Sequence, residues 1–326
     1  MTSKHLSLWM PRKKAENQSA LWIIPVKQER PMSSELKETY EHNGYKLKWT
    51  SFGPETAQPL VFIHGTPWSS RLWAPIALAV AQTLSYRVYL LDNPGYGESH
   101  ERTAEAKGTK PQVSLADQAA AFVAIAKDCW GFNEGNKPII VAHDFGGIIS
   151  LRANLLHGIP YKALFLADPV ALRPTGSPFF RLVGKNAEVF NSVPPSVFTG
   201  FVRSYIAEAA HKPLPESTLQ ELCAPWLVSD ETRADFIAQI AQFDQQHIAD
   251  VDGRYKEISA AMPVKIAWAK QDYWIPVEAA YRLADAMGIA HEEVSIVDEA
   301  GHLIQIDAPE RLTAEIVSWL LKLERT

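Results

Sequence analysis

Apolar and polar positions alternate along the chain from about residue 45 in a pattern that predicts strands separated by helices. Short runs that are apolar or alternating predict strands at Tyr45–Thr50, Leu60–Ile63, Arg87–Leu91, Pro138–Ala142, Ala163–Ala167, Val264–Trp268 and Glu293–Val297. Longer stretches with helical spacing lie between them, at Ser70–Leu84, Leu115–Trp130, Gly147–His157, Val277–Met287 and Pro309–Lys322. Leu60–Ile63 and Pro138–Ala142 are apolar throughout, as strands buried on both faces of a parallel sheet are. The alternation predicts an α/β fold with a wound, mostly parallel sheet.

The interval from Ala171 to Ala261 interrupts this rhythm, because it contains no convincing strand. Its helical segments, such as Pro195–Ala210 and Glu231–Ala249, are separated by prolines. An interval of this length is too long for a loop. We therefore expect residues 171–261 to form an inserted helical cap over the carboxyl ends of the strands, where ligands bind in open α/β sheets. Residues 42–170 and 262–326 would form the core.

The composition is that of an ordinary globular protein. The 326 residues are 47% apolar and 21% charged, which excludes a mostly disordered chain. The net charge of −5 argues against nucleic-acid binding, and no apolar run approaches the roughly 18 residues of a membrane helix. Two cysteines, Cys129 and Cys223, cannot form a disulfide framework and fit a reducing, cytoplasmic environment. Residues 1–41 lack the apolar segment of a secretory signal, and we expect a solvated N-terminal extension.

Three loops that follow predicted strands carry residues suited to nucleophilic catalysis. Asp144 lies in the sequence AHDFGG at positions 142–147, which has the small-x-nucleophile-x-Gly form of a nucleophile elbow. A carboxylate at that position can attack carbon and form an ester. Asp272 and His302 follow the last two strands, in the chain order nucleophile, acid, base. His302 would activate water, and Asp272 would orient the imidazole.

Each of these residues also has an ordinary structural interpretation. Asp144 could cap the following helix, Asp272 could be a turn residue, and His302 could lie in a surface loop. All three fall at predicted strand ends, which favours catalysis. Thr66, in HGTP at positions 64–67, also follows a buried strand directly, and its backbone N–H is a candidate oxyanion donor.

Together these motifs resemble the α/β-hydrolase family from about Glu41 onward, and within it the epoxide hydrolase and haloalkane dehalogenase branch. The matching segments are HGTP at 64–67, DNPGYGES at 92–99, AHDFGG at 142–147, AKQDYWIP at 269–276 and EAGHLIQIDAPE at 299–310. The resemblance implies that Asp144 is the nucleophile, His302 the base and Asp272 the acid. It also implies an oxyanion hole made by the N–H groups of Thr66 and Phe145, and a reaction without a metal or an organic cofactor.

Two positions near the nucleophile leave the chemistry open. Many proteins of the similar haloalkane dehalogenase family have a Trp directly after the nucleophile, and its indole N–H holds the departing halide. This chain has Phe145 at that position, and its side chain has no hydrogen-bond donor. Trp68 or Trp226 could supply that N–H instead. Some dehalogenases take their acid from an earlier strand end, which makes Asp168 the alternative to Asp272.

Epoxide hydrolases need a cap tyrosine that protonates the opening ring, and Tyr205 and Tyr255 are the available candidates. Ordinary packing is an equally good explanation for each. Tyr273, beside Asp272, is expected to line the entrance of the site together with Trp274.

The sequence therefore predicts an epoxide hydrolase-like enzyme that forms an ester on Asp144 and acts with water on a medium-sized, apolar small molecule. A haloalkane dehalogenase with the same triad is one alternative. Another is an esterase or carbon–carbon bond hydrolase in which Asp144 forms no ester. The alternative outside enzymes is a ligand receptor on the same fold.

Overall fold

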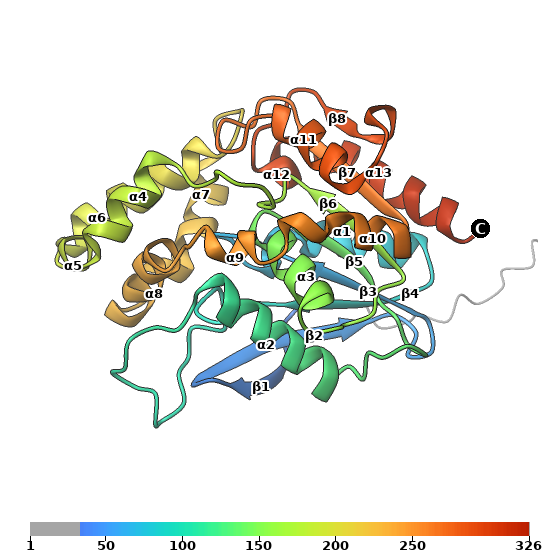
Figure 1. Cartoon of the computed structure of the whole chain (residues 1–326). Helices are drawn as coiled ribbons and strands as arrows, with labels where there is room; N and C mark the ends of the chain where they lie inside the picture. The colour runs from blue at the N-terminus through green and yellow to red at the C-terminus, as the bar shows by residue number, and fades with distance from the viewer. Residues whose placement is uncertain (1–32, 326) are drawn as a thin grey trace, which may run out of the picture. The chain divides into compact units, whose positions relative to one another are not determined.

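The computed structural model describes residues 33–325, so most of the predicted N-terminal extension lies outside the described residues. An eight-stranded sheet runs through the molecule in the order β1-β2-β4-β3-β5-β6-β7-β8 (Figure 1). The strands are β1 (Glu38–His42), β2 (Tyr45–Phe52), β3 (Gln58–Ile63), β4 (Tyr86–Leu91), β5 (Ile139–His143), β6 (Ala163–Ala167), β7 (Val264–Ala269) and β8 (Ser295–Val297). Strand β2 is antiparallel to both of its neighbours, and all other pairs are parallel. The predicted wound, mostly parallel sheet is confirmed.

Helices cover both faces of the sheet. One face packs against α1 (Ala74–Thr83) and α13 (Pro309–Leu323). The other packs against α2 (Leu115–Asp128), α3 (Phe145–Leu155), α10 (Tyr255–Ala261) and α11 (Glu278–Met287). Alternate residues of β3 enter the two cores, since Val61 and Ile63 face one side while Leu60 and Phe62 face the other. Burial on both faces explains why this strand is apolar throughout.

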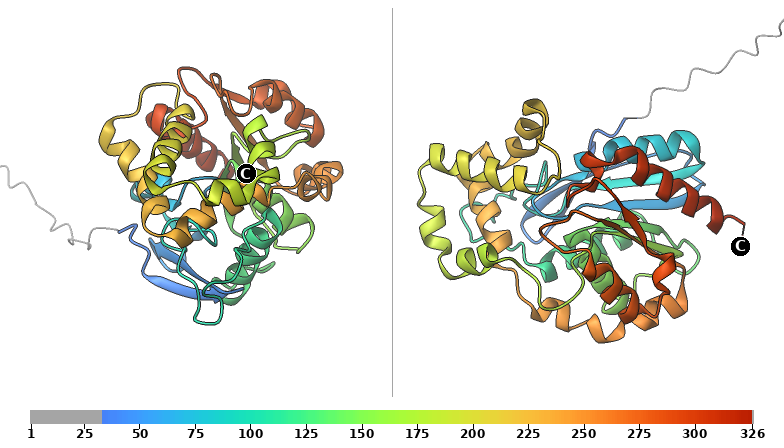
Figure 2. Two further views of the ribbon diagram at one scale, coloured as in Figure 1. Left: turned by 90° about the vertical axis from the view of Figure 1, so that its left-hand side faces the viewer. Right: turned by 90° about the horizontal axis from the view of Figure 1, so that it is seen from above.

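The cap consists of five helices at one end of the sheet, well seen in the right-hand view of Figure 2. They are α4 (Pro178–Lys185), α5 (Ala187–Asn191), α6 (Pro195–Glu208), α7 (Glu216–Cys223) and α8 (Asp230–Ala241), with the short helix η2 (Ala224–Leu227) between the last two. Their inward residues form a hydrophobic cluster that is separate from the two sheet cores. This arrangement agrees with the expected helical insertion over the strand ends.

The C-terminal part of the interval assigned to the cap belongs to the core instead. The predicted helix Glu231–Ala249 is broken, because α8 ends at Ala241 and α9 begins at Gln246. From α9 (Gln246–Ala249) through η3 (Asp252–Arg254) to α10, the buried residues belong to the main core, which is the one between the sheet and helices α2, α3 and α11. The chain has therefore already returned from the cap at this point.

Other element boundaries in the structure differ from the predicted ones where the pattern of apolar residues is ambiguous. Residues 38–41, assigned to the extension, belong to the edge strand β1, whose polar sequence lacks an apolar face. Strand β8 starts later than predicted, because His291–Glu293 form the short helix η4. A short helix η1 (Ser70–Leu72) precedes α1, and α12 (Ile304–Asp307) precedes α13. No helix within residues 33–325 is both long and apolar enough to cross a membrane.

Candidate active site

Asp144 occupies a sharp turn between β5 and α3. Its φ of 52° and ψ of −122° place a non-glycine residue in a strained conformation that is typical of a nucleophile elbow. Small neighbours are required here. A Cβ on Gly146 would lie 2.4 Å from the Ile63 carbonyl oxygen, and a Cβ on Gly65 would lie 2.2 Å from Asp144 Oδ1. The glycines of both motifs therefore let the loop after β3 approach the elbow closely.

The three residues predicted as a triad lie together at the carboxyl ends of β5, β7 and β8. His302 Nδ1 lies 2.8 Å from Asp272 Oδ2, and His302 Nε2 lies 3.3 Å from Asp144 Oδ2. Asp272 is oriented through its other oxygen, which accepts the N–H groups of Trp274 and Ile275 at 2.8 Å each. All three side chains are buried, so these contacts are shielded from water.

The two oxygens of Asp144 have different surroundings. Oδ1 accepts the Thr66 backbone N–H at 2.6 Å, while Oδ2 faces His302. Phe145 is the first residue of α3, where backbone N–H groups have no partner within the helix. Of the two predicted oxyanion donors, the Thr66 N–H thus contacts the carboxylate, and the Phe145 N–H lies at a helix end that favours negative charge. Thr66 also donates its hydroxyl to Gln239 Oε1 on α8, a contact between loop and cap that no local sequence signal indicated.

The surroundings of His302 favour its protonated, positively charged form. Burial alone would lower its pKa, but the charges of Asp272 and Asp144 outweigh burial and hold the pKa well above its ordinary value. The neighbouring His143 behaves in the opposite way, because burial and the charge of His302 lower its pKa to about 3. His143 is therefore neutral, and its Nε2 lies 2.9 Å from the His302 carbonyl oxygen, in hydrogen-bonding contact.

Asp168, the alternative acid, does not pair with His302. It lies at the end of β6, where its Oδ1 accepts the Ala269 N–H at 2.8 Å. Burial and the adjacent charge of Asp272 raise the pKa of Asp168 well above its ordinary value. The structure thus gives the contact with the imidazole to Asp272, which follows the next strand.

A cavity of about 970 Å³ opens above Asp144, between the core and the cap. Its lining is largely aromatic and includes Phe145, Phe179, Phe180, Phe201, Tyr205, Phe243, Tyr273 and Trp274. The ring of Tyr205 stacks on Trp274 with a centroid distance of 4.6 Å, and Trp274 in turn lies 5.1 Å from the His302 ring. Tyr205 and Tyr273 therefore lie where they were expected. Phe179, Phe180, Phe201 and Glu208 were not predicted, since they look like ordinary amphipathic-helix residues in sequence.

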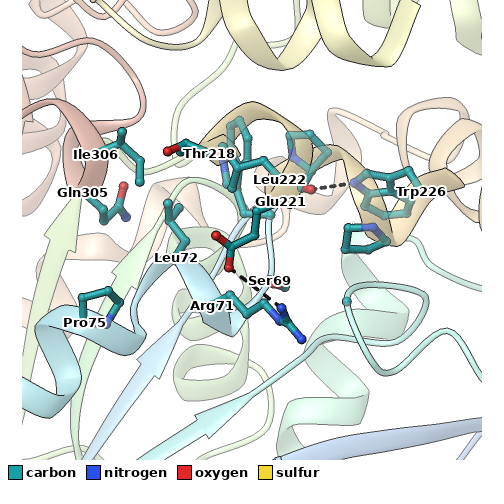
Figure 3. Close-up of a pocket in the computed structure, with 14 residues that line it drawn as sticks. Ser69, Arg71, Leu72, Pro75, Thr218, Glu221, Leu222, Trp226, Gln305 and Ile306 are labelled. Atoms are coloured by element: carbon teal, nitrogen blue, oxygen red, sulfur yellow. Dashed lines mark hydrogen bonds and ion pairs between the residues drawn. The ribbon is translucent and has the colours of Figure 1, made fainter. Parts of the chain in front are cut away.

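Three predicted substrate contacts lie elsewhere. Tyr255 packs in the main core and donates its hydroxyl to the Ala171 carbonyl at 2.5 Å, because α10 is not part of the cap. Trp226 donates its N–H to the Pro67 carbonyl at 2.9 Å (Figure 3). Trp226 and Trp68 line a separate pocket of about 210 Å³ at the boundary between cap and core. Within residues 33–325, no group of three or more acidic, His or Cys side chains is arranged to hold a metal ion.

Comparison with known proteins gives a consistent picture. Residues 60–315 match the model of the Alpha/beta hydrolase family. An alpha/beta hydrolase fold protein from Burkholderia ambifaria is 36% identical, with a TM-score of 0.75 over 87% of this chain and 98% of that one. Haloalkane dehalogenase DbeA from Bradyrhizobium elkani USDA94 is 17% identical, with a TM-score of 0.69 over 88% of this chain and 98% of that one, a likeness of fold alone. In sequence, the chain is 24% identical over 293 residues to the dihydrolipoyllysine-residue acetyltransferase component of the acetoin cleaving system of Pseudomonas putida, covering 86% of this chain and 68% of that protein.

Proposed function

This chain belongs to the alpha/beta hydrolase family, and from that premise we propose that it opens epoxides through an ester formed on Asp144. The observation that carries the proposal is the placement of the Asp144 carboxylate. One oxygen accepts the Thr66 N–H, the other contacts the buried His302, and the residue itself lines the cavity. A carboxylate held in this way is already oriented for attack on carbon.

In the first step, Asp144 Oδ2 attacks an epoxide carbon and the ring carbon–oxygen bond breaks. The ring oxygen takes the phenolic proton of Tyr205, whose ring lines the cavity. Burial and the charge of Asp144 raise the pKa of Tyr205 well above its ordinary value, so the phenol keeps its proton until a strong alkoxide base forms. The product of this step is a hydroxyalkyl ester on Asp144.

Ester formation removes the charge of Asp144, so His302 can give the proton that it holds in the resting enzyme to the Tyr205 phenolate. In the second step, the neutral His302 takes a proton from water, and the hydroxide attacks the carboxyl carbon of Asp144. The negative charge then develops on Oδ1, which the Thr66 N–H already contacts at 2.6 Å. Collapse of this intermediate breaks the bond between the carboxyl carbon and Oδ2, and the departing alkoxide takes a proton from His302, which gives the diol. The new carboxylic acid of Asp144 then returns a proton to His302, which restores the carboxylate and the protonated imidazole.

The cavity supports a medium-sized, apolar substrate with an aromatic part. Its volume of about 970 Å³ is in the range of sites for small organic molecules. The stacked Tyr205 and Trp274 rings form a flat surface beside the triad. An aromatic substituent on the epoxide would pack against that surface.

A haloalkane dehalogenase is the second candidate, favoured by the indole of Trp274. This side chain lines the cavity beside His302, and its indole N–H makes no hydrogen bond within the described part of the chain. A departing halide needs such a donor. An ester on Asp144 would form in either reaction, a hydroxyalkyl ester from an epoxide and an alkyl ester from a haloalkane.

The decisive experiment uses the variant His302→Gln, in which the ester should persist because no base activates water. The variant is incubated with aromatic epoxides and haloalkanes, and intact and peptide masses are recorded. We expect an adduct on the Asp144 peptide that carries the whole mass of the epoxide. An adduct that lacks the halogen would establish dehalogenation instead. A folded variant that forms no adduct with any reactive substrate would contradict the ester mechanism.

A further inference from the structure

The proposed mechanism leaves one buried acid beside the triad unused. Asp168 directly follows β6 and Asp272 follows β7, and these two strands are paired in parallel with Ala167 opposite Ala267. The two carboxyl groups therefore leave neighbouring strands at the same edge of the sheet. Asp168 is fully buried, and its φ of 42° holds it in a conformation that non-glycine residues rarely adopt.

The hydrogen bonds of the two acids are unequal. Asp272 accepts three N–H groups, two from the backbone and one from His302. Asp168 Oδ1 accepts one, from Ala269, whereas Oδ2 is buried and accepts none from the described residues. An ionised carboxylate with a single donor is costly to bury. A proton on Oδ2 removes that charge and turns the oxygen into a donor.

Asp272 is the acceptor available to that donor. Burial raises the pKa of Asp168, and the charge of Asp272 and a hydrogen-bonding interaction with that carboxyl raise it further. Two adjacent carboxyls do not both ionise in a buried site. Asp272 keeps the charge because it has more donors and because it contacts His302. The charge of His302 acts to lower the pKa of Asp168, so Asp168 is within electrostatic reach of the imidazole.

We propose that Asp168 is a protonated carboxyl that donates a hydrogen bond to Asp272, and that it ionises and takes over as triad acid when Asp272 loses its carboxylate. Asp168 is thus a positioning residue that acts on His302 through Asp272. The raised pKa of Asp168, caused by burial and by Asp272, supports this assignment. The second part of the proposal rests on the function proposed above.

The test compares Asp168→Asn, Asp272→Asn and the double variant. Asn keeps a hydrogen-bond donor at position 168 and tolerates positive φ, but an amide is a weaker donor to Asp272 than a carboxylic acid, so we expect Asp168→Asn to slow hydrolysis of the Asp144 ester by about threefold. Asp272→Asn should slow this hydrolysis by about 10²- to 10³-fold, which is less than the roughly 10⁴-fold loss when the acid of a Ser-His-Asp triad is replaced by Asn. The double variant should lose at least about a further tenfold, so that the change at position 168 costs more when the carboxylate of Asp272 is absent.

Two outcomes would overturn the proposal. If Asp168→Asn alone were as slow as Asp272→Asn, Asp168 would be needed as a carboxylate. If the double variant matched Asp272→Asn, Asp168 would hold no reserve. If Asp168 had a purely structural role, its replacement would not cost more activity in Asp272→Asn than in the wild type. It would also leave the pH profile of Asp272→Asn unchanged.

An infrared measurement tests the proton without using activity. The wild type should show the carbonyl band of a buried, protonated carboxyl group, and Asp168→Asn should lack it. Absence of such a band in the wild type would contradict the assignment even if no substrate were found. Failure of the ester mechanism alone would leave the band in place, so the two failures are distinguishable. Urea unfolding of each variant checks that the fold is retained.

Discussion

Tyr205 lines the cavity together with Asp144, and its hydroxyl makes no hydrogen bond within the described residues. We predict that Tyr205→Phe slows ester formation from an epoxide by about 10²- to 10⁴-fold, because the opening ring loses its proton donor. Formation of an alkyl ester on Asp144 from a haloalkane should change little, since the departing halide needs no proton. Rapid-quench single-turnover measurements with both substrates would show the difference. Tyr273→Phe is the matched control, because Tyr273 also lines the cavity but is 72% exposed.

The protonation of His302 should follow the charge of Asp144. The pKa of His302 is raised by Asp272 and Asp144 against the effect of burial, so its protonated form stabilises the fold below about pH 6.5. That contribution is lost as the pH rises through the raised value. Ester formation removes the charge of Asp144, which lowers the pKa of His302 and releases the base for the second step.

This coupling can be measured directly by replacing the nucleophile. We predict that Asp144→Asn lowers the titration midpoint of the His302 ring in NMR spectra, because the substitution removes one of the two charges that hold the proton. The variant should also lose the part of its pH-dependent stability that this charge supplies. An unchanged midpoint would show that Asp272 alone sets the protonation state.

At the scale of elements, helix α8 is tied to the core by a buried ion pair. Asp235 on α8 accepts the Arg102 guanidinium at 2.6 Å and the Tyr45 hydroxyl at 2.9 Å. Arg102 and Asp235 are almost fully buried. Because Gln239 of the same helix contacts Thr66, this attachment also supports the loop that carries Thr66.

We predict that Arg102→Met lowers the free energy of unfolding by about 3 to 5 kcal/mol at about pH 8, because Asp235 is left buried and unpaired. Burial raises the pKa of Asp235 to about 6 although Arg102 lowers it, and loss of Arg102 raises it further. An acid whose pKa is raised on folding loses stability as the pH rises, so the deficit should be smaller at about pH 5. Urea unfolding at both pH values measures it. Arg311→Met, which removes an exposed guanidinium from its pair with Glu315, should change stability by less than about 1 kcal/mol. A loss equal to that of Arg102→Met would contradict the prediction.

At the scale of the whole molecule, the charge around the cavity should select substrates. The lining includes two carboxylates, Asp144 and Glu208, and no Lys or Arg among the described residues. Glu208 has no ion pair or hydrogen bond within that part of the chain. The cavity should therefore disfavour substrates that carry a carboxylate, and the net charge of −5 acts in the same sense.

We predict that Glu208→Gln raises kcat/KM for a carboxylate-bearing epoxide by about three- to tenfold at low salt, with little change for its neutral isostere. Added salt should reduce the difference. Glu231→Gln is the control, because it removes an exposed charge from α8 that does not line the cavity. Equal gains in both variants would show that net charge, and not Glu208, governs selection.

Much of this protein follows from local sequence chemistry. Buried parallel strands must be apolar on both faces, and this requirement identified β3 and β5 in the sequence. The elbow around Asp144 and the loops of Asp272 and His302 were also predictable, because parallel strands end at one edge of a sheet and bring those loops together. The polar edge strand β1 could not be predicted in this way, since it has no apolar face.

Only the tertiary structure decided which side chains reach the cavity. Tyr205 and Tyr255 are equivalent in sequence, yet one lines the site and the other packs under the sheet, because the chain returns from the cap before α10. The choice of Asp272 over Asp168 depends on which strand end faces the imidazole. Such contacts join residues far apart in the chain, and they are set by packing, about which the local sequence pattern carries no information.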